Sequence, residues 1–152
     1  MLIDMSLEQK IMNDIKSAMI AKNGLKLEVL RAIKSEILLL KTNKDSVSLT
    51  EEKEIILLQK LLKQRSEAQK IYHEQGRQDL AEHENNQSNV IKSYLPTPYS
   101  FQEIESLVDS VIKELGVSSK QDMGRIMSVV IQRAKGRADG KTLSDCIKKK
   151  LN

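Results

Sequence analysis

The run Leu95-Pro96-Thr97-Pro98 holds both prolines of the 152-residue chain. Each proline biases the residue before it away from helical backbone, so the run predicts an extended break between helices. Ser100 and Glu103 follow at the spacing of a capping box, which predicts that a new helix begins directly after the break. We therefore predict an N-terminal helical domain over residues 1–95, a proline-containing linker over 96–98 and a C-terminal domain over 99–152.

The first two helices are predicted from apolar residues that recur at helical spacing upstream of the linker. The first begins at Asp4 or Ser6 and ends at Asn23-Gly24, a pair that tolerates left-handed backbone. The second carries an apolar stripe that Leu38 and Leu39 widen. A stripe this wide predicts a helix that is buried on most sides.

Two more helices are expected before the linker. Residues 42–49 are polar and predict a loop, after which Thr50 is the expected cap of the third helix. Gly76 is expected to end that helix. The fourth helix has a wholly polar middle over residues 82–89, which predicts a surface face or an outer helix, because this stretch has nothing to bury.

Three shorter helices are predicted after the linker. Gly116 is expected to end the first of them, and Ser119 is expected to cap the second. Residues 136–140 predict a loop, and Thr142 with Asp145 predicts the cap of the last helix. The chain is therefore expected to be all-α, with an N-terminal unit of about four helices followed by a small three-helix tail.

The composition supports the same fold class. Aromatic residues make up 3% of the chain and there are only six glycines, a mixture that fits helices rather than a β-sandwich or barrel. A single cysteine cannot form an internal disulfide, which suits a reducing compartment. Neither a signal peptide nor an apolar run long enough to span a membrane is recognisable, so we expect a cytoplasmic protein without a membrane partner.

Positive charge is concentrated near the C-terminus. The whole chain has a net charge of +4, and residues 100–152 contribute +3 of it. Residues 133–150 contain seven basic and only two acidic residues. A local basic patch of this kind is the footprint of a polyanionic partner. A solvated helix with a lysine tail explains the same charges, and the sequence does not decide between the two.

Catalytic and metal-binding constellations are not recognisable in the sequence. His73 and His83 lie ten residues apart, unlike the ligand pair of a helical zinc site, and Cys146 is the only cysteine. Cys146 sits among lysines, but no neighbouring base can be assigned to it. We therefore predict no catalytic residue, no metal site and no cofactor.

A binding site is predicted where the last two helices are joined. Two glycines alternate with basic residues there, and the segment leads into a helix N-terminus, which favours an anion such as phosphate. Arg125 lies on the preceding helix, away from its apolar face. A connection whose glycines only satisfy turn geometry remains the alternative. The candidate nucleic-acid-binding residues are Arg125, Lys135, Gly136, Arg137, Gly140 and Lys141.

Several motifs along the chain resemble the GatB/YqeY family, from about Leu7 onward. In order they are Lys60-Leu-Leu-Lys-Gln-Arg65, Tyr72, Gly76-Arg77, Asp79-Leu-Ala81, Tyr94-Leu-Pro96, Ser118-Ser-Lys-Gln-Asp-Met-Gly-Arg125 and Lys135-Gly-Arg-Ala-Asp-Gly140. YqeY-like proteins resemble the C-terminal helical and tail region of GatB, a subunit of the glutamine-dependent aspartyl/glutamyl-tRNA amidotransferase. The resemblance implies a helical unit followed by a three-helix tail.

The resemblance also implies a role on tRNA. In GatB the equivalent region contacts the tRNA body, which maps onto the candidate residues above and, more weakly, onto Lys63 and Arg65. The amide chemistry resides elsewhere in the amidotransferase, so we interpret the family label of carbon–nitrogen ligase with glutamine as amide donor as inherited. We expect a non-catalytic module that binds tRNA. The alternatives are a protein–protein adaptor and an accessory factor of the amidotransferase.

Overall fold

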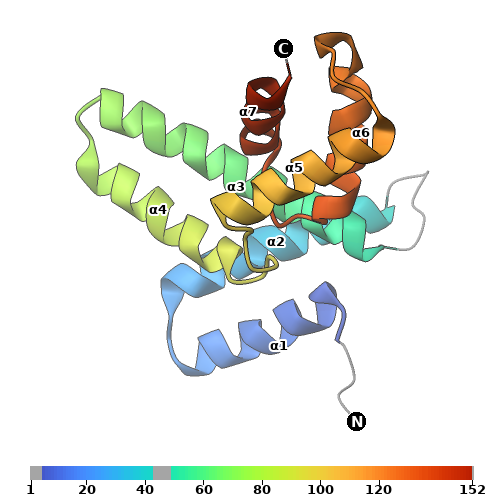
Figure 1. The fold of residues 1–152 in the computed structure, drawn as a ribbon. Helices are drawn as coiled ribbons and strands as arrows, with labels where there is room; N and C mark the ends of the chain where they lie inside the picture. The colour runs from blue at the N-terminus through green and yellow to red at the C-terminus, as the bar shows by residue number, and fades with distance from the viewer. Residues whose placement is uncertain (1–4, 43–48, 152) are drawn as a thin grey trace. The chain divides into compact units, whose positions relative to one another are not determined.

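The computed structural model describes residues 5–42 and 49–151. The described residues fold as α-helices without a strand, which confirms the predicted all-α class. The chain divides into two compact units, Met1–Leu95 and Pro96–Asn152. The elements, labelled in Figure 1, are α1 (Leu7–Ile20), α2 (Gly24–Thr42), α3 (Glu51–Glu74), α4 (Gln78–Lys92), α5 (Phe101–Leu115), the 3₁₀ turn η1 (Lys120–Asp122), α6 (Met123–Ala134) and α7 (Gly140–Lys150).

A reciprocal cap fixes the start of α1. The Ser6 hydroxyl accepts the Gln9 backbone N–H at 3.3 Å, and the Gln9 side chain accepts the Ser6 N–H at 3.2 Å. Two helix N–H groups that lack partners within the helix are satisfied in this way. Of the two predicted starts, Ser6 is therefore confirmed, whereas Asp4 lies outside the described residues.

The turn between α1 and α2 corrects the predicted end of the first helix. Lys22, rather than Asn23 or Gly24, takes the left-handed conformation that ends α1, with φ of 54°. The Asn23 N–H then donates to the Ala18 carbonyl at 2.9 Å, as in a Schellman motif. The Asn23 side chain accepts the Lys26 N–H at 3.1 Å, so Asn23 begins α2 instead of ending α1. Asparagine is a favoured N-cap residue, which explains why Asn23 caps α2 rather than ending α1.

One core joins the four helices of the N-terminal unit. The stripe predicted on α2 is confirmed, but Leu38 and Leu39 are 47% and 64% exposed, so the prediction that α2 is buried on most sides is wrong. Packing by α1, α3 and α4 covers only one side of α2. The buried residues of this core are Leu7, Ile11, Ala18, Val29, Leu30, Ile33, Ile37, Leu57, Leu58, Leu61 and Ile91.

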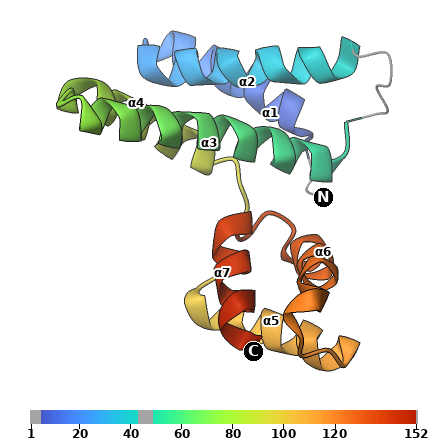
Figure 2. The same cartoon turned by 90° about the horizontal axis from the view of Figure 1, so that it is seen from above.

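Helices α3 and α4 lie side by side (Figure 2). The Thr50 hydroxyl caps α3 by accepting the Lys53 N–H at 3.3 Å, and Gly76, with φ of 71°, follows its last turn as predicted. The expectation that the polar middle of α4 has nothing to bury is wrong. Gln87 and Ser88 are both 5% exposed, because the tight pairing of the two helices covers that side of α4.

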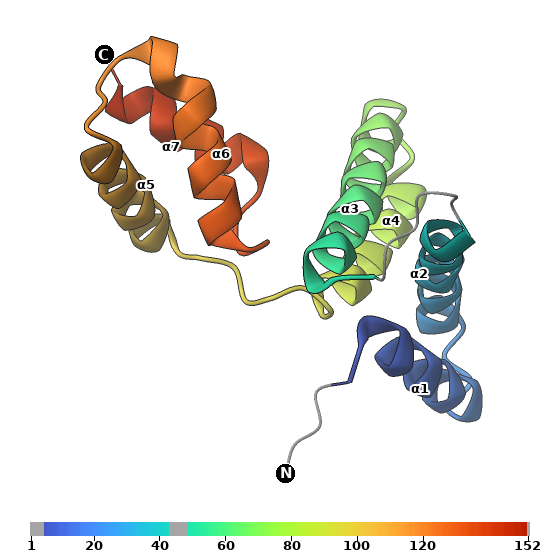
Figure 3. The ribbon, with the colours of Figure 1, turned by 90° about the vertical axis from the view of Figure 1, so that its right-hand side faces the viewer.

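Helices α5, α6 and α7 pack around a second core (Figure 3). The predicted capping box of Ser100 and Glu103 is present, and Gly116 ends α5 with φ of 65°. The Ser119 hydroxyl caps η1, which leads into α6, rather than capping α6 itself. The buried residues of this core are Ile104, Val108, Val111, Ile126, Val130, Ala134, Leu143, Cys146, Ile147 and Leu151.

Candidate nucleic-acid interface

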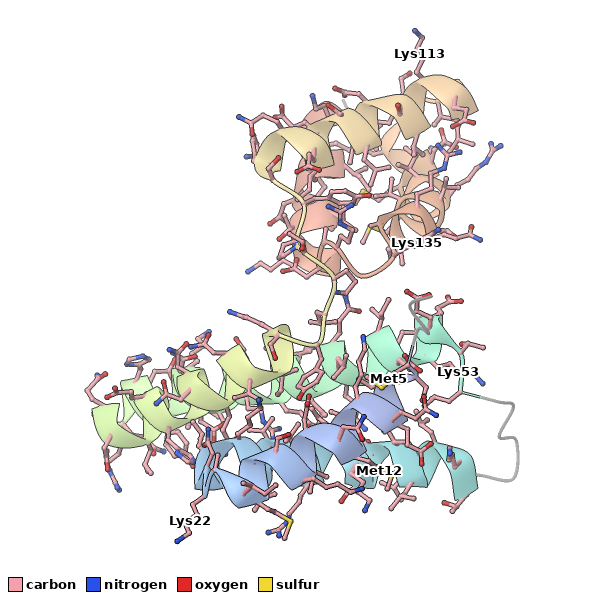
Figure 4. The ribbon with its side chains drawn as sticks, turned by 90° about the horizontal axis from the view of Figure 1, so that it is seen from below. Met5, Met12, Lys22, Lys53, Lys113 and Lys135 are labelled. Atoms are coloured by element: carbon pink, nitrogen blue, oxygen red, sulfur yellow. The ribbon has the colours of Figure 1, made fainter. Side chains whose placement is uncertain are left out.

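The connection between α6 and α7 begins with two residues in left-handed backbone. Lys135 has φ of 47° and Gly136 has φ of 80°. Glycine adopts this conformation freely, whereas a lysine there costs roughly 1–2 kcal/mol. Lys135 nevertheless occupies the position, and its side chain is exposed on the C-terminal unit (Figure 4). Lys135 is thus an exposed cation whose own backbone has an unfavourable conformation.

Arg137 is tied into the structure on several sides. Its carbonyl accepts the Tyr99 N–H at 2.7 Å, its Nε donates to the Thr97 carbonyl at 2.8 Å, and its guanidinium stacks 4.0 Å from the centre of the Tyr99 ring. Its Nη2 also lies 4.0 Å from a carboxylate oxygen of Glu103. The side chain predicted to bind phosphate therefore holds residues 97–99 against the start of the α6–α7 connection.

The N-terminus of α7 already carries an anion of the chain itself. The Asp139 carboxylate accepts the Thr142 N–H at 2.7 Å and is the N-cap of α7. The predicted cap by Thr142 and Asp145 is therefore wrong, and Gly140 is the first helical residue rather than part of a loop. Because Asp139 occupies a donor and adds negative charge, the predicted phosphate site at this helix end is much weakened.

The remaining candidate cations of this unit fall into two places. Lys135 and Lys141 are exposed residues on either side of the short connection between α6 and α7. Arg125 is exposed in the first turn of α6, ten residues before Lys135. At 1.5 Å per residue, Arg125 and Lys135 are about 15 Å apart along the helix axis. Lys135 and Lys141 therefore flank the same short connection, whereas Arg125 lies at the opposite end of α6.

Three carboxylates of the C-terminal unit are engaged by other cations. Arg133 pairs with Glu114 at 2.6 Å, Lys150 with Asp109 at 3.2 Å, and Arg137 lies near Glu103. The hydrogen bond from Arg133 lowers the pKa of the Glu114 carboxyl. Within the described residues, Arg125, Lys135 and Lys141 have no carboxylate within 4.0 Å. Their charge is therefore free to act on a ligand.

Lys63 and Arg65 do not form a joint patch on α3. They are two residues apart, so their side chains leave the helix about 160° from each other. Lys63 is exposed, whereas Arg65 is partly buried and its Nε has no hydrogen-bond partner among the described residues. Only Lys63 is thus presented to solvent in the manner of a phosphate contact.

The side chains considered for chemistry lie in unreactive surroundings. Burial raises the pKa of the Cys146 thiol, which opposes formation of the nucleophilic thiolate. The His83 Nε2 is 3.1 Å from the Gln87 side-chain nitrogen and 3.7 Å from a Glu28 oxygen. Across residues 5–42 and 49–151, no three histidine, cysteine or carboxylate side chains are placed to hold a metal ion.

Sequence reasoning missed Asp139 as the α7 cap and Tyr99 as the partner of Arg137. The first had a signal, because Asp139 is a favoured N-cap residue that stands four positions before Leu143, the first apolar residue of α7. The second had none, because Tyr99 and Arg137 are 38 positions apart and only the tertiary fold brings them together.

The sequence profile of a family described as Yqey-like protein matches residues 8–151, nearly the whole chain. The chain belongs to the YqeY-like family. This membership agrees with the resemblance found in the motifs, and it places the candidate cations inside the region that defines the YqeY-like family.

Two curated relatives of this YqeY-like chain are both named "Altered inheritance of mitochondria protein 41, mitochondrial". The one from Pyrenophora tritici-repentis is 32% identical over 133 residues, which cover 85% of this chain and 71% of the relative. The one from Clavispora lusitaniae is 40% identical over 83 residues, which cover 54% of this chain and 47% of the relative. The matched segment is thus less than half the length of the second relative. Among its described helices, this chain has none with the length and apolar content needed to cross a membrane.

Proposed function

We propose that this YqeY-like chain is a non-catalytic helical module that binds tRNA through its C-terminal unit. The observation that carries the proposal is the pair Lys135 and Lys141, two exposed cations that flank the α6–α7 connection without a carboxylate partner in the described structure. Their unit carries a net charge of +3. Phosphates of a folded RNA are the natural counterpart of such charges.

The mode of binding follows from the scarcity of aromatic residues. The chain has one phenylalanine, three tyrosines and no tryptophan, and Tyr99 is already stacked on Arg137. Few aromatic side chains are therefore available for unpaired bases to stack on. Contacts to the backbone of duplex regions fit the residues better, with Arg125 reaching a phosphate separate from those at Lys135 and Lys141.

Binding of unmodified tRNA by the purified chain at several salt concentrations tests this proposal. The logarithm of the association constant is expected to fall linearly with the logarithm of salt concentration, with a slope of about 0.9 for each neutralised phosphate. Lys135→Glu with Lys141→Glu weakens binding and lowers the slope, whereas Lys10→Glu with Lys16→Glu, the same charge change in the N-terminal unit, does not. Absence of binding at low salt, or equal loss in both double variants, contradicts the proposal.

The non-catalytic part of the proposal has its own assay. Burial of Cys146 and the raised pKa of its thiol oppose nucleophilic catalysis. The purified chain, incubated with glutamine and aspartyl- or glutamyl-tRNA, is expected to release no ammonia and to form no amide. Product formation by the chain alone contradicts this part, whereas stimulation of a separate amidotransferase identifies an accessory factor.

We infer that the chain works in a reducing compartment and assign it to the cytoplasm. Its single cysteine is free and buried, so the fold relies on no disulfide. Fractionation of cells that express an epitope-tagged full chain tests the assignment. Recovery with mitochondria, the location in the names of the two relatives, contradicts it.

A further inference from the structure

The helix pair α1–α2 carries an unexpected excess of positive charge. Residues 5–42 contain seven lysines and arginines but only four carboxylates, whereas residues 49–95 contain seven basic and eight acidic residues. The near-neutral total of the N-terminal unit therefore hides a segregation of charge between its two halves. These cations are different residues from those assigned above to RNA.

All four carboxylates of this helix pair are engaged inside the unit. Glu8 pairs with Lys41, Glu36 lies 3.4 Å from Lys60, and the Tyr94 hydroxyl donates to Asp14. Glu28 lies 3.7 Å from the His83 ring. Of the seven cations, only Lys41 is paired with a carboxylate in the described structure. The outer surface of α1 and α2 therefore presents a net positive charge, which complements an acidic partner.

Exposed apolar side chains lie beside this charge, along the line where α1 and α2 meet, which we call the seam. The Glu8–Lys41 ion pair joins the start of α1 to the end of α2, so these two packed helices run antiparallel. At 100° per residue, Met12 lies only about 40° around α1 from Glu8, and Leu38 lies about 60° around α2 from Lys41. Met12 is 45% exposed and Leu38 is 47% exposed, so both line the seam on its solvent side.

The seam continues along the helix pair with the same character. Met19, which is 56% exposed, lies about 20° around α1 from Glu8, and Arg31, which is also exposed, lies about 80° around α2 from Lys41. Lys34 lies about 20° around α2 from Lys41. We call Met12, Met19, Leu38, Arg31 and Lys34 the seam surface. Figure 4 labels Met12 on α1 within this region.

We propose that the seam surface docks an acidic amphipathic helix of a partner protein. The two exposed methionines have flexible, polarisable side chains. These side chains can change conformation to pack against the apolar face of a bound helix. Arg31 and Lys34 complement acidic residues that border such an apolar face. The partner is thus defined by leucine-like anchors at helical spacing, flanked by Glu or Asp.

Three synthetic peptides of about 20 residues, long enough to hold helical structure, test the chemistry. The first has leucine at i, i+3, i+4 and i+7 with glutamate on its polar face, the second replaces every glutamate with lysine, and the third replaces every leucine with serine. The full-length chain is expected to bind only the first, with amide shifts in nuclear magnetic resonance spectra confined to α1 and α2. Failure of the first peptide to bind, or equal binding of the first and third, overturns the proposal.

Two neighbouring leucines provide a matched pair of variants. Leu38 lines the seam, whereas Leu39 lies about 160° around α2 from Lys41 and is even more exposed, at 64%. Leu38→Glu is expected to weaken binding of the first peptide about tenfold or more, because a charged carboxylate replaces a leucine that the docked helix buries. Leu39→Glu leaves the affinity within about twofold. Equal effects of the two variants overturn the proposal.

Control measurements distinguish a protein-docking surface from a lipid-binding or RNA-binding one. Circular dichroism tests whether each variant is folded. If Leu38→Glu is not folded, Met12→Glu takes its place in the binding test. Vesicles containing phosphatidylserine, bound in a Leu38-dependent way while the acidic peptide is not, assign the surface to lipid and overturn the proposal. Peptide binding that persists in Lys135→Glu with Lys141→Glu supports it and keeps it distinct from tRNA binding, whereas loss of peptide binding in that variant overturns it.

Discussion

The guanidinium carbon of Arg137 lies 4.0 Å from the centre of the Tyr99 ring, although 38 positions separate the two residues in the chain. The Arg137 carbonyl also accepts the Tyr99 N–H, and its Nε donates to Thr97. One arginine therefore fixes the segment before α5 onto the α6–α7 connection. Arg137 therefore shapes the surface on which Lys135 and Lys141 lie.

Removal of the Arg137 side chain is expected to destabilise the C-terminal unit. Arg137→Ala loses one hydrogen bond and one cation–π contact, so its free energy of unfolding falls by about 1–2 kcal/mol. Arg137→Lys restores little, because lysine lacks the planar fork that stacks and donates at once. Urea unfolding monitored by circular dichroism measures the change. Tyr99→Phe keeps the ring and is the control, and additive losses in Arg137→Ala and Tyr99→Ala would show that the two side chains are not coupled.

Asp139 is expected to affect stability and RNA affinity in different ways. Asp139→Ala loses the cap of α7 and lowers the free energy of unfolding by about 1 kcal/mol. Asp139→Asn keeps a capping oxygen but removes a negative charge between Lys135 and Lys141, so tRNA binding at low salt becomes tighter while stability changes little. Thermal unfolding and filter binding measure the two effects. Weaker binding by Asp139→Asn would show that RNA does not approach this connection.

Acid is expected to destabilise α5 through its capping box. Hydrogen bonds from the Ser100 backbone N–H and hydroxyl hold the pKa of Glu103 below its ordinary value of 4.5. Because the folded state favours the carboxylate, its contribution is complete above pH 4.5 and is lost as pH falls through the lowered pKa. Glu103→Gln retains a capping oxygen but cannot titrate, so its stability depends less on pH in this range. Unfolding at a series of acidic pH values measures the difference, and identical profiles for the two proteins would refute this account.

Much of the fold was predictable because its signals are local. Caps such as Ser6, Thr50 and Ser100 and the glycines that end α3 and α5 act within a few residues, so sequence spacing reveals them. The exposure of Leu38 and Leu39 was not predictable, because it depends on how many neighbouring helices cover α2. In the candidate site, the spacing located the connection and its lysines. The role of Arg137 depends on Tyr99 and Thr97, which only the tertiary fold brings to it. The role of Asp139 depends on which of several polar residues becomes the N-cap of α7.

Lys22 and Lys135 offer a matched test of whether strain is retained for function. They are the two residues other than glycine with positive φ in the described structure, at 54° and 47°, and each follows the end of a helix. Replacing either with glycine relieves roughly 1–2 kcal/mol of backbone strain and costs about 0.5–1 kcal/mol in entropy, so both variants are expected to be slightly more stable.

The two glycine variants are expected to diverge in tRNA binding. Lys22→Gly leaves affinity unchanged because Lys22 lies between α1 and α2, whereas Lys135→Gly loses a phosphate contact and about one unit of the salt slope. Thermal unfolding together with tRNA titrations at two salt concentrations gives both quantities for each protein. A more stable Lys135→Gly variant that binds tRNA less well shows that the left-handed lysine is kept for its charge. If its affinity is unchanged, Lys135 makes no phosphate contact, and the RNA interface must lie elsewhere on the chain.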